Sequence, residues 1–359
     1  MKSLKLFTFI FALFFIQSAR ALDISNFQKH LTDKIVSQTF LDPKEQTFCV
    51  KGPDFEFAQN GAKQIVPASV AKIYTTNFVL EKLDKNIVFE TKLRIIKNVL
   101  YIKSEGDPTF SEKELLDFLL KEKLKNPKLK INKIVYDKNF IYDFSFDKKS
   151  LENNLQKFID KNKESKEDYF DKKVKIVKVY KTLIGKNFTV YKSPKLLEII
   201  KEMNEYSNNS IAVNLLNKVG GPNMMMNNLR KKYDVNAQQM FFRNGSGLLG
   251  NYTTCDLTIK VLENINKNAK AKNFEIANVF DSPGKENTAM RNILKDYKYD
   301  GKIYAKNGYL YGYNTIAGVY ENNGKKVFFA VFLNYANAND YQKGISTIDE
   351  MLKIIINNN

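Results

Sequence analysis

The chain has 359 residues, of which 43% are hydrophobic and 27 are Phe, so its composition excludes disorder except locally. Its 57 Lys and Arg residues outnumber 39 Asp and Glu residues, and the formal net charge of +18 favours an anionic neighbour such as a cell-wall polymer, a membrane face or nucleic acid. A lysine-rich proteome would explain the same charge. With one histidine (His30) and two cysteines, the sequence offers no metal-ligand cluster. In an oxidising compartment Cys49 and Cys255 could pair.

The first 21 residues, MKSLKLFTFIFALFFIQSARA, combine lysines, an apolar run and the small-residue pattern Ala19-Arg20-Ala21. This order predicts a secretory signal cleaved before Leu22, because the run is short for a membrane span, with an uncleaved N-terminal anchor as the alternative. Cleavage removes three cations and leaves +15. The remaining 338 residues exceed one ordinary core, so we expect one large domain with an insertion, or two domains.

Periodicity predicts the elements of the first part of the chain. Residues 24–36 read as a helix with His30 at the surface, and Thr47 to Asn60 as two short strands joined at Gly52-Pro53-Asp54. A helix begins near Pro67 and Ser69, and its apolar residues predict one buried face. Further elements are expected in this order: strands in 89–106, a helix at 111–124 and a strand in 131–142.

The second part opens with residues 146–173, which are dense in both charges and predict a small inserted subdomain or a mobile segment. Helices follow over 193–220. We expect three C-terminal strands, through Lys306, through Ile316 to Tyr320 and through Val327 to Tyr335, with a tight turn at 322–324. A final helix is expected over 340–356. Strands at both ends of the chain predict one antiparallel sheet covered by helices.

Ser69 and Lys72, in the stretch VPASVAK, are the first chemical candidates. Three residues apart at a helix start, they share one helix face, where the helix dipole discourages a proton on the lysine. A lysine of lowered pKa can serve as general base for a serine nucleophile. Because no Gly-x-Ser-x-Gly motif occurs and His30 is isolated, a serine enzyme here needs a base other than histidine. Taken alone, Ser-x-x-Lys is a weak signal that is better explained by a capping serine followed by a solvated lysine.

Two further motifs favour catalysis. Ser207-Asn208-Asn209 lies at a helix junction, and Lys306-Asn307-Gly308 lies on an expected strand. Each triplet is common, but the order Ser-x-x-Lys, Ser-x-Asn and Lys-Thr-Gly is typical of penicillin-binding proteins and serine β-lactamases.

The chain resembles the class C low-molecular-mass penicillin-binding proteins, the D-alanyl-D-alanine carboxypeptidase/endopeptidase family. Beside the three motifs, further family-like stretches span nearly the whole mature chain: GDPTF (106–110), KIVYDKNFI, YSNNSIAVNLL, NGSGLLGNYTT (244–254) and KNGYLYGYNTIAGVY. The resemblance implies an α+β, serine β-lactamase/DD-peptidase-like fold, with an antiparallel sheet from the N- and C-terminal segments flanked by helices and with a reduced inserted subdomain. The expected divisions are a signal at 1–21, the penicillin-binding domain at 22–90 and 190–359, and the insertion at 91–189.

The resemblance also implies the roles of the site residues. Ser69 would be the acylated nucleophile and Lys72 its base. Ser207 would relay a proton to the leaving amine, Asn209 would hold Lys72 and the substrate amide, and Lys306 would attract the terminal carboxylate. The remaining expected site residues are substrate-binding: Asn307, Gly308 and Tyr309, the last providing an oxyanion-hole N–H together with that of Ser69.

Three departures from the family pattern stand out. Asn307 replaces the usual threonine, which bears on carboxylate recognition and penicillin affinity. Only 138 positions separate Ser69 from Ser207, too few for the large insertion common in the family. The segment PGKENTAMR replaces a glycine-rich stretch, which leaves Thr288 and Arg291 as secondary binding candidates.

The resulting hypothesis is a periplasmic peptidoglycan hydrolase without metal or organic cofactor. Its expected partners are peptidoglycan stem peptides and β-lactams, with no nucleic acid. Peripheral membrane contact, oligomeric state and the balance of carboxypeptidase and endopeptidase action stay open. The alternatives are a catalytically weak or inactive relative that binds peptidoglycan or a partner, and a serine β-lactamase. Met224 to Met226 are expected to pack in a helix, and Gly245-Ser246-Gly247 to form a turn near the cleft.

Overall fold

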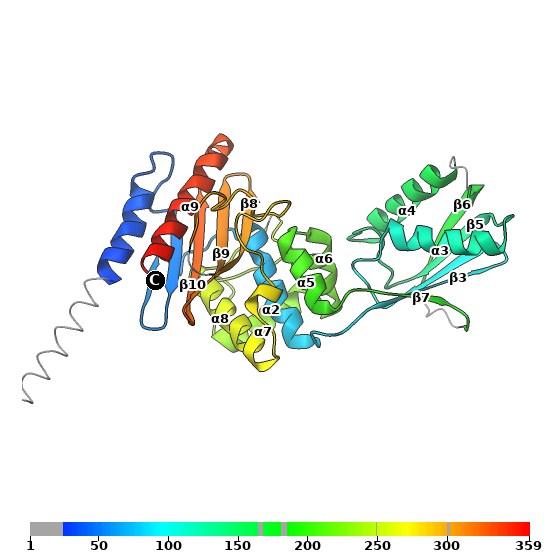
Figure 1. The fold of residues 1–359 in the computed structure, drawn as a ribbon, viewed down its shortest axis with the longest axis horizontal. Helices are drawn as coiled ribbons and strands as arrows, with labels where there is room; N and C mark the ends of the chain where they lie inside the picture. The colour runs from blue at the N-terminus through cyan, green and yellow to red at the C-terminus, as the bar shows by residue number, and fades with distance from the viewer. Residues whose placement is uncertain (1–23, 164–167, 181–184, 249, 300–301) are drawn as a thin grey trace, which may run out of the picture. The chain divides into compact units, whose positions relative to one another are not determined.

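The computed structural model describes residues 24–163, 168–180, 185–248, 250–299 and 302–359. The signal predicted at residues 1–21 lies outside this part of the chain. The chain divides into two units. The first contains its described residues up to Asn77, with Met226–Arg243 and Gly247–Asn359; the second contains Phe78–Met225 and Asn244–Ser246. Figure 1 follows the elements along the chain.

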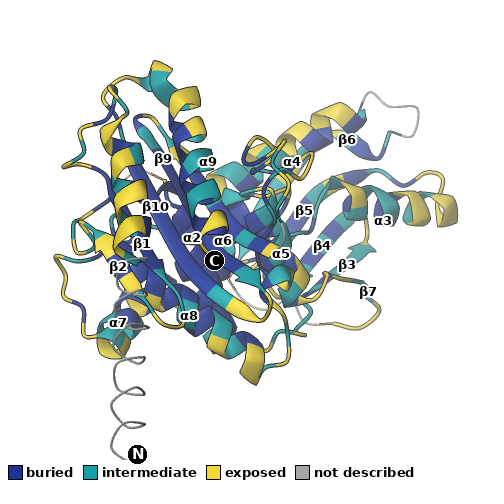
Figure 2. Cartoon of the chain, turned by 60° about the vertical axis from the view of Figure 1, so that its left-hand side comes forward, coloured by how far each residue is buried: buried dark blue, intermediate teal, exposed yellow. Residues whose placement is uncertain are grey.

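The first unit is built on a five-stranded antiparallel sheet made from both ends of the sequence, as predicted. Its order is β2 (Glu56–Gln59), β1 (Thr47–Lys51), β10 (Lys325–Asn334), β9 (Tyr313–Asn322) and β8 (Lys302–Leu310). Strands β9 and β10 are almost wholly buried, which Figure 2 shows in dark blue. Both faces of these strands are therefore covered, and β8 forms an edge.

Helices cover the two faces of this sheet. The helix at residues 24–36 and α9 (Tyr341–Asn357) pack into one apolar cluster with alternate residues of β10, such as Phe329 and Val331. The intervening residues point to the opposite face, because side chains alternate along a strand. There α8 (Cys255–Ala271) contacts β1 and β10. The predicted helices at both ends of the chain are confirmed, and His30 is exposed.

The two cysteines form a disulfide between β1 and the first residue of α8. Cys49 and Cys255 have Cα atoms 6.0 Å apart and link positions 206 residues apart in sequence. The sequence left this pairing open. Such a bond is typical of proteins in oxidising compartments.

The second unit contains a mixed five-stranded sheet with the order β6-β5-β4-β3-β7. Strands β4 and β5 are parallel, as are β5 and β6, while β3 pairs antiparallel with β4 and β7. The strand bounds are β3 (Glu90–Ile96), β4 (Val99–Ser104), β5 (Ile131–Asp137), β6 (Phe170–Val179) and β7 (Thr189–Lys192). Helices α3 (Glu112–Lys125) and α4 (Lys148–Lys163) pack against it in one apolar cluster. The expected domain boundaries at 90 and 190 stay a prediction.

The described residues of the charged stretch 146–173 lie mostly in a helix and at the start of β6; whether the stretch is a small subdomain or a mobile segment stays a prediction. Residues 148–163 form α4, whose buried side chains Leu151, Leu155, Phe158 and Ile159 follow helical spacing. A few apolar residues are enough to bury one side of α4, because they all lie on the same helix face.

The remaining helices include the predicted run over 193–220, which forms α5 (Leu196–Glu205) and α6 (Asn209–Lys218). The other elements are α2 (Ala71–Lys82), α7 (Gly221–Tyr233) and three short 3-10 turns, η1 (Ala68–Val70), η2 (Ile276–Asn278) and η3 (Ala338–Asp340). Met225 and Met226 are buried residues of α7, as expected, while Met224 is half exposed. No helix among the described residues is long and apolar enough to cross a membrane.

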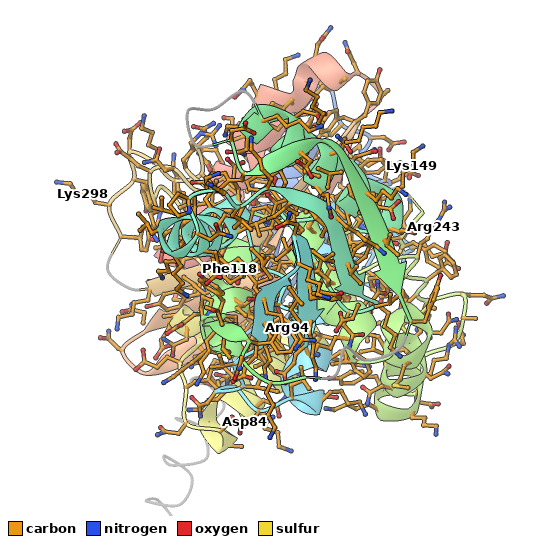
Figure 3. All side chains as sticks on the ribbon, turned by 90° about the vertical axis from the view of Figure 1, so that its right-hand side faces the viewer. Asp84, Arg94, Phe118, Lys149, Arg243 and Lys298 are labelled. Atoms are coloured by element: carbon orange, nitrogen blue, oxygen red, sulfur yellow. A yellow bond between two sulfur atoms is a disulfide. The ribbon has the colours of Figure 1, made fainter. Side chains whose placement is uncertain are left out.

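Part of the positive charge lies on exposed side chains. Lys149, Arg243 and Lys298 are exposed and extend from the ribbon (Figure 3). Lys72 and Lys306, in contrast, are buried.

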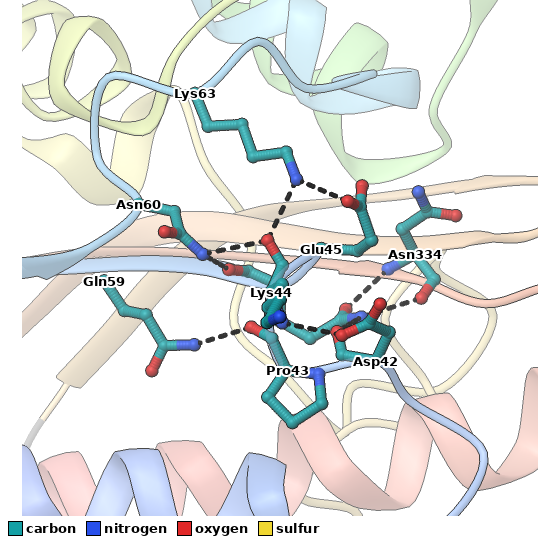
Figure 4. Close-up of polar contacts among 9 residues, drawn as sticks. Asp42, Pro43, Lys44, Glu45, Gln59, Asn60, Lys63 and Asn334 are labelled. Carbon is teal, nitrogen blue, oxygen red and sulfur yellow. Dashed lines mark hydrogen bonds and ion pairs between the residues drawn. The ribbon is translucent and has the colours of Figure 1, made fainter.

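A polar network fixes the loops around β1, ahead of the segment that leads to Ser69 (Figure 4). Buried Gln46 bonds across to β10, donating to the Asn334 carbonyl at 2.9 Å and accepting from its N–H at 2.8 Å. Asn60 donates to the Gln46 carbonyl, and Lys63 pairs with Glu45 at 2.8 Å. These bonds hold the segment that precedes residue 67 against β1 and β10.

Candidate active site

Ser69 lies in a strained turn rather than in the first turn of a regular helix. It is the middle residue of η1, which leads directly into α2. The preceding Ala68 has φ of +47°, a left-handed conformation that costs a non-glycine residue on the order of 1–3 kcal/mol. From Pro67 to Leu80 every residue is buried except Ser69. Ser69 is therefore the one partly exposed residue of an otherwise buried segment.

Three residues of the first unit hold this turn in place. Thr315 of β9 donates its hydroxyl to the Pro67 carbonyl at 2.9 Å. A Cβ on Gly247 would lie 1.7 Å from the Ala68 carbonyl oxygen, and one on Gly308 would lie 2.6 Å from the Ser69 nitrogen. Only glycine permits these approaches. Gly247 has φ of +88° and follows a bend at 243–246, but no sequence pattern predicted its close approach to Ala68 or the bond from Thr315.

One buried lysine contacts this serine, and a second buried lysine, on another element, acts on the first. Lys72 of α2 places Nζ 3.0 Å from Ser69 Oγ, and its side chain is fully buried. Lys306 of β8 is 1% exposed. Burial lowers the pKa of Lys72 well below its usual value, and the charge of Lys306 lowers it further. These causes favour a neutral Lys72 amine beside the serine hydroxyl.

Asp281 acts on the second lysine. Burial lowers the pKa of Lys306 to about 7, and the carboxylate of Asp281 opposes that shift. Asp281 is 2% exposed and bridges to β8, where the Ala305 N–H donates to its carbonyl at 2.9 Å. A buried acid next to β8 favours positive charge on Lys306. Nothing in the sequence around Asp281 indicated this role, because it depends on a tertiary contact.

Asn307 forms hydrogen bonds on both sides. The Lys306 ammonium donates to its main-chain oxygen at 2.8 Å and to its side-chain Oδ1 at 3.1 Å. Its Nδ2 donates to the Ala289 carbonyl at 2.8 Å. The asparagine thus connects β8 to the segment that precedes it. Its role in substrate binding stays a prediction.

The residues beyond Asn307 line a small cavity at the end of β8. Tyr309 is 48% exposed, and its ring centroid lies 4.3 Å from that of Tyr341. Arg291 lines the same cavity, which also touches Asn307 and Gly308. Thr288, the other secondary candidate, is 3% exposed and donates to the Lys285 carbonyl. Of these two candidates, only Arg291 presents its side chain at the cavity.

Ser207 and Asn209 belong to the second unit. Ser207 has φ of +56° in the turn between α5 and α6, and the side chain of Asn208 caps α6 by accepting from the Ile211 N–H at 3.1 Å. The Ser210 hydroxyl donates to the Phe144 carbonyl, which anchors the start of α6. The junction expected from the sequence is present. That Ser207 and Asn209 complete the site around Ser69 stays a prediction.

A protein-family comparison decides the relationship. The model of the D-Ala-D-Ala carboxypeptidase 3 (S13) family matches residues 55–138 and 156–354. The chain belongs to this family. Family membership confirms the resemblance predicted from the three motifs and makes the chain a serine peptidase by descent. No curated protein sequence matches it.

Solved structures similar to this S13 chain agree on its fold. A penicillin G-acylated Bd3459 predatory endopeptidase from Bdellovibrio bacteriovorus, in complex with immunity protein Bd3460, is 23% identical with a TM-score of 0.69, covering 87% of this chain and 92% of that one. Penicillin-binding protein 4 from Haemophilus influenzae, complexed with a β-lactam, is 16% identical with a TM-score of 0.68, covering 92% and 99%. The TLA-1 extended-spectrum β-lactamase reaches 0.52 at 17% identity, covering 91% and 96%. The expected α+β, DD-peptidase-like fold is confirmed.

Proposed function

We propose that this S13 chain hydrolyses peptidoglycan in the periplasm through an acyl-enzyme on Ser69. It would act as a D-Ala-D-Ala carboxypeptidase, as a DD-endopeptidase on D-alanyl-diaminopimelate cross-links, or as both. The observation that carries the proposal is the 3.0 Å separation of Lys72 Nζ from the hydroxyl of the partly exposed Ser69, with burial, and then the charge of Lys306, lowering the pKa of Lys72. A neutral amine at that distance is a general base.

In the acylation step, the Ser69 proton passes to Lys72 as Oγ bonds to the carbonyl carbon of the penultimate D-alanine. The carbonyl electrons move to oxygen, and the oxyanion is held by the N–H groups of Ser69 and Tyr309. Gly308 favours this arrangement because its missing side chain lets β8 approach the Ser69 nitrogen. Preorganised donors of this kind contribute about 2.7–4 kcal/mol each to the barrier reduction.

In the steps that follow, the C–N bond breaks and the leaving amine takes a proton from Lys72 through the Ser207 hydroxyl. Asn209 would hold the substrate amide. Water then attacks the ester, with Lys72 again accepting a proton, and the shortened peptide leaves with Ser69 restored. β-Lactams would acylate the same serine; the Bd3459 endopeptidase, which is similar in fold, is described as penicillin G-acylated.

Purified muropeptides test the proposal. We expect either loss of one D-alanine from monomeric pentapeptides or conversion of cross-linked dimers to monomers, detected by mass spectrometry, and no product with Ser69→Ala. Unchanged muropeptides with wild-type protein that melts cooperatively would favour the inactive-relative alternative. Rapid turnover of a chromogenic cephalosporin would favour the β-lactamase alternative.

A further inference from the structure

The leaving group in this reaction carries a carboxylate next to the scissile amide, and the hydroxyl that the family offers there is missing. Asn307 stands in the threonine position, and its amide bonds to Lys306 and to the Ala289 carbonyl. The side-chain amide of Asn307 is therefore hydrogen-bonded within the protein. Recognition of the carboxylate requires another group.

Lys306 is not a full substitute for that hydroxyl. Its ammonium already donates to two oxygens of Asn307, and burial disfavours its charged form. A carboxylate site needs a donor that is charged throughout the working range. Arginine meets that condition, with a planar group that binds carboxylates through two hydrogen bonds.

Arg291 lies at the right place in the first unit. It lines a cavity of about 50 Å³ with Asn307, Gly308, Tyr309 and Tyr341. Gly308 is the residue packed against the Ser69 nitrogen, so the cavity borders the proposed oxyanion hole. Burial raises the pKa of Tyr341, and the nearby charge of Arg291 opposes that shift.

Among the described residues, the Arg291 guanidinium has one hydrogen-bond acceptor, which leaves other N–H groups to donate to a ligand. Its NH1 donates to the Thr288 carbonyl at 3.2 Å, one bond from a group with five N–H donors. This bond and the Asn307 bond to Ala289 act on the same short segment, 288–291. Asn307 thereby fixes the segment from which Arg291 extends.

We propose that Arg291 binds the carboxylate of the leaving residue and that Asn307 positions Arg291 through the Ala289 carbonyl. This inference rests on the proposed function and names its substrate class: peptides with a free carboxylate beside the scissile amide nitrogen. Arg291 is the specificity-determining group, and Asn307 acts through it.

Two peptides that differ only in charge test Arg291. A diacylated L-Lys-D-Ala-D-Ala and the same peptide with a C-terminal carboxamide are compared by kcat/KM. Wild-type protein should prefer the carboxylate. Arg291→Ala should reduce that preference at least tenfold through KM, and Arg291→Lys should retain part of it. Lys298→Ala removes an exposed cation seven residues further along the chain and should leave the preference unchanged.

The outcomes separate the inference from the proposed function. An intact preference in Arg291→Ala, or an equal loss for both peptides in both Arg291 variants, overturns the inference while Ser69 acylation stands. Absence of Ser69 acylation in wild-type protein overturns both.

A double-mutant cycle tests the positioning role of Asn307. Asn307→Ala alone should reduce the carboxylate preference severalfold. In the Arg291→Ala background it should reduce the preference no further, because the group it positions is gone. A reduction of the same factor in both backgrounds would show that Asn307 acts independently of Arg291.

Discussion

The turn around Ser69 and the edge strand β8 differ in how closely they keep the family pattern. The turn retains serine and lysine, and Thr315, Gly247 and Gly308 fix its strained backbone. Strand β8 retains Lys306 and Gly308 but replaces the hydroxyl between them with an amide that bonds inside the protein. The comparison teaches that the residues proposed to make and break bonds are kept, while the residue proposed to recognise substrate has changed.

The largest effect should come from removing the base. Lys72→Met keeps the apolar stem and eliminates a buried amine, so the protein should fold while acylation by fluorescent penicillin slows by about 10²–10⁴-fold. Stopped-flow acylation measures the rate, and a thermal melt checks folding. A loss of less than tenfold in a folded variant would show that another group takes the serine proton.

The next largest effect should follow Gly308→Ala. The new Cβ would lie 2.5 Å from Thr315 Oγ1 and 2.6 Å from the Ser69 nitrogen, so the proposed oxyanion hole must distort. We expect the acylation rate to fall by about 10²–10³-fold. Gly324→Ala is the control for the added methyl group, because no atom lies within 4 Å of the Cβ that it adds; its φ of +76° adds backbone strain that Gly308 does not have, so the control is the more demanding one. Equal activity of the two variants would contradict the account.

Lys306→Met tests the electrostatic coupling between the two regions. The charge of Lys306 lowers the pKa of Lys72 beyond the effect of burial, so removing that charge raises the pKa of Lys72. Neutral Lys72 then becomes abundant only at higher pH, and the rising limb of the acylation rate shifts to the alkaline side. The pH profile of the acylation rate constant measures this. An unmoved or acid-shifted limb would mean that Lys306 does not act on Lys72.

Asn307→Thr should have the smallest effect. It exchanges the hydrogen bonds of the amide for one hydroxyl, and a net change of about 0.5–1.5 kcal/mol corresponds to roughly 2–12-fold in kcat/KM. Kinetics with the carboxylate peptide measure this change. A gain of several orders of magnitude from a nearly silent wild type would instead identify the chain as a degenerate relative.

The sequence predicted the parts of the site that have local patterns. The three motifs, their order and the sheet built from both chain ends were legible because helix starts, turns and strand alternation leave short signatures. Asp281 and Thr315 were missed, since each acts through a fold contact with no pattern around it. Strand β6 was missed because it is rich in lysines, which lie mostly at the surface. Its sequence therefore lacks the apolar run that would predict a strand paired in parallel with β5.

One measurement tests the central claim, that Ser69 is the acylated nucleophile. Wild-type protein and Ser69→Ala are incubated with penicillin G, and intact and proteolysed samples are analysed by mass spectrometry. The account predicts one added penicillin per chain, located on the peptide that contains Ser69 and absent from the variant. No adduct on a folded wild-type chain, or an adduct on another residue that survives in the variant, would contradict it.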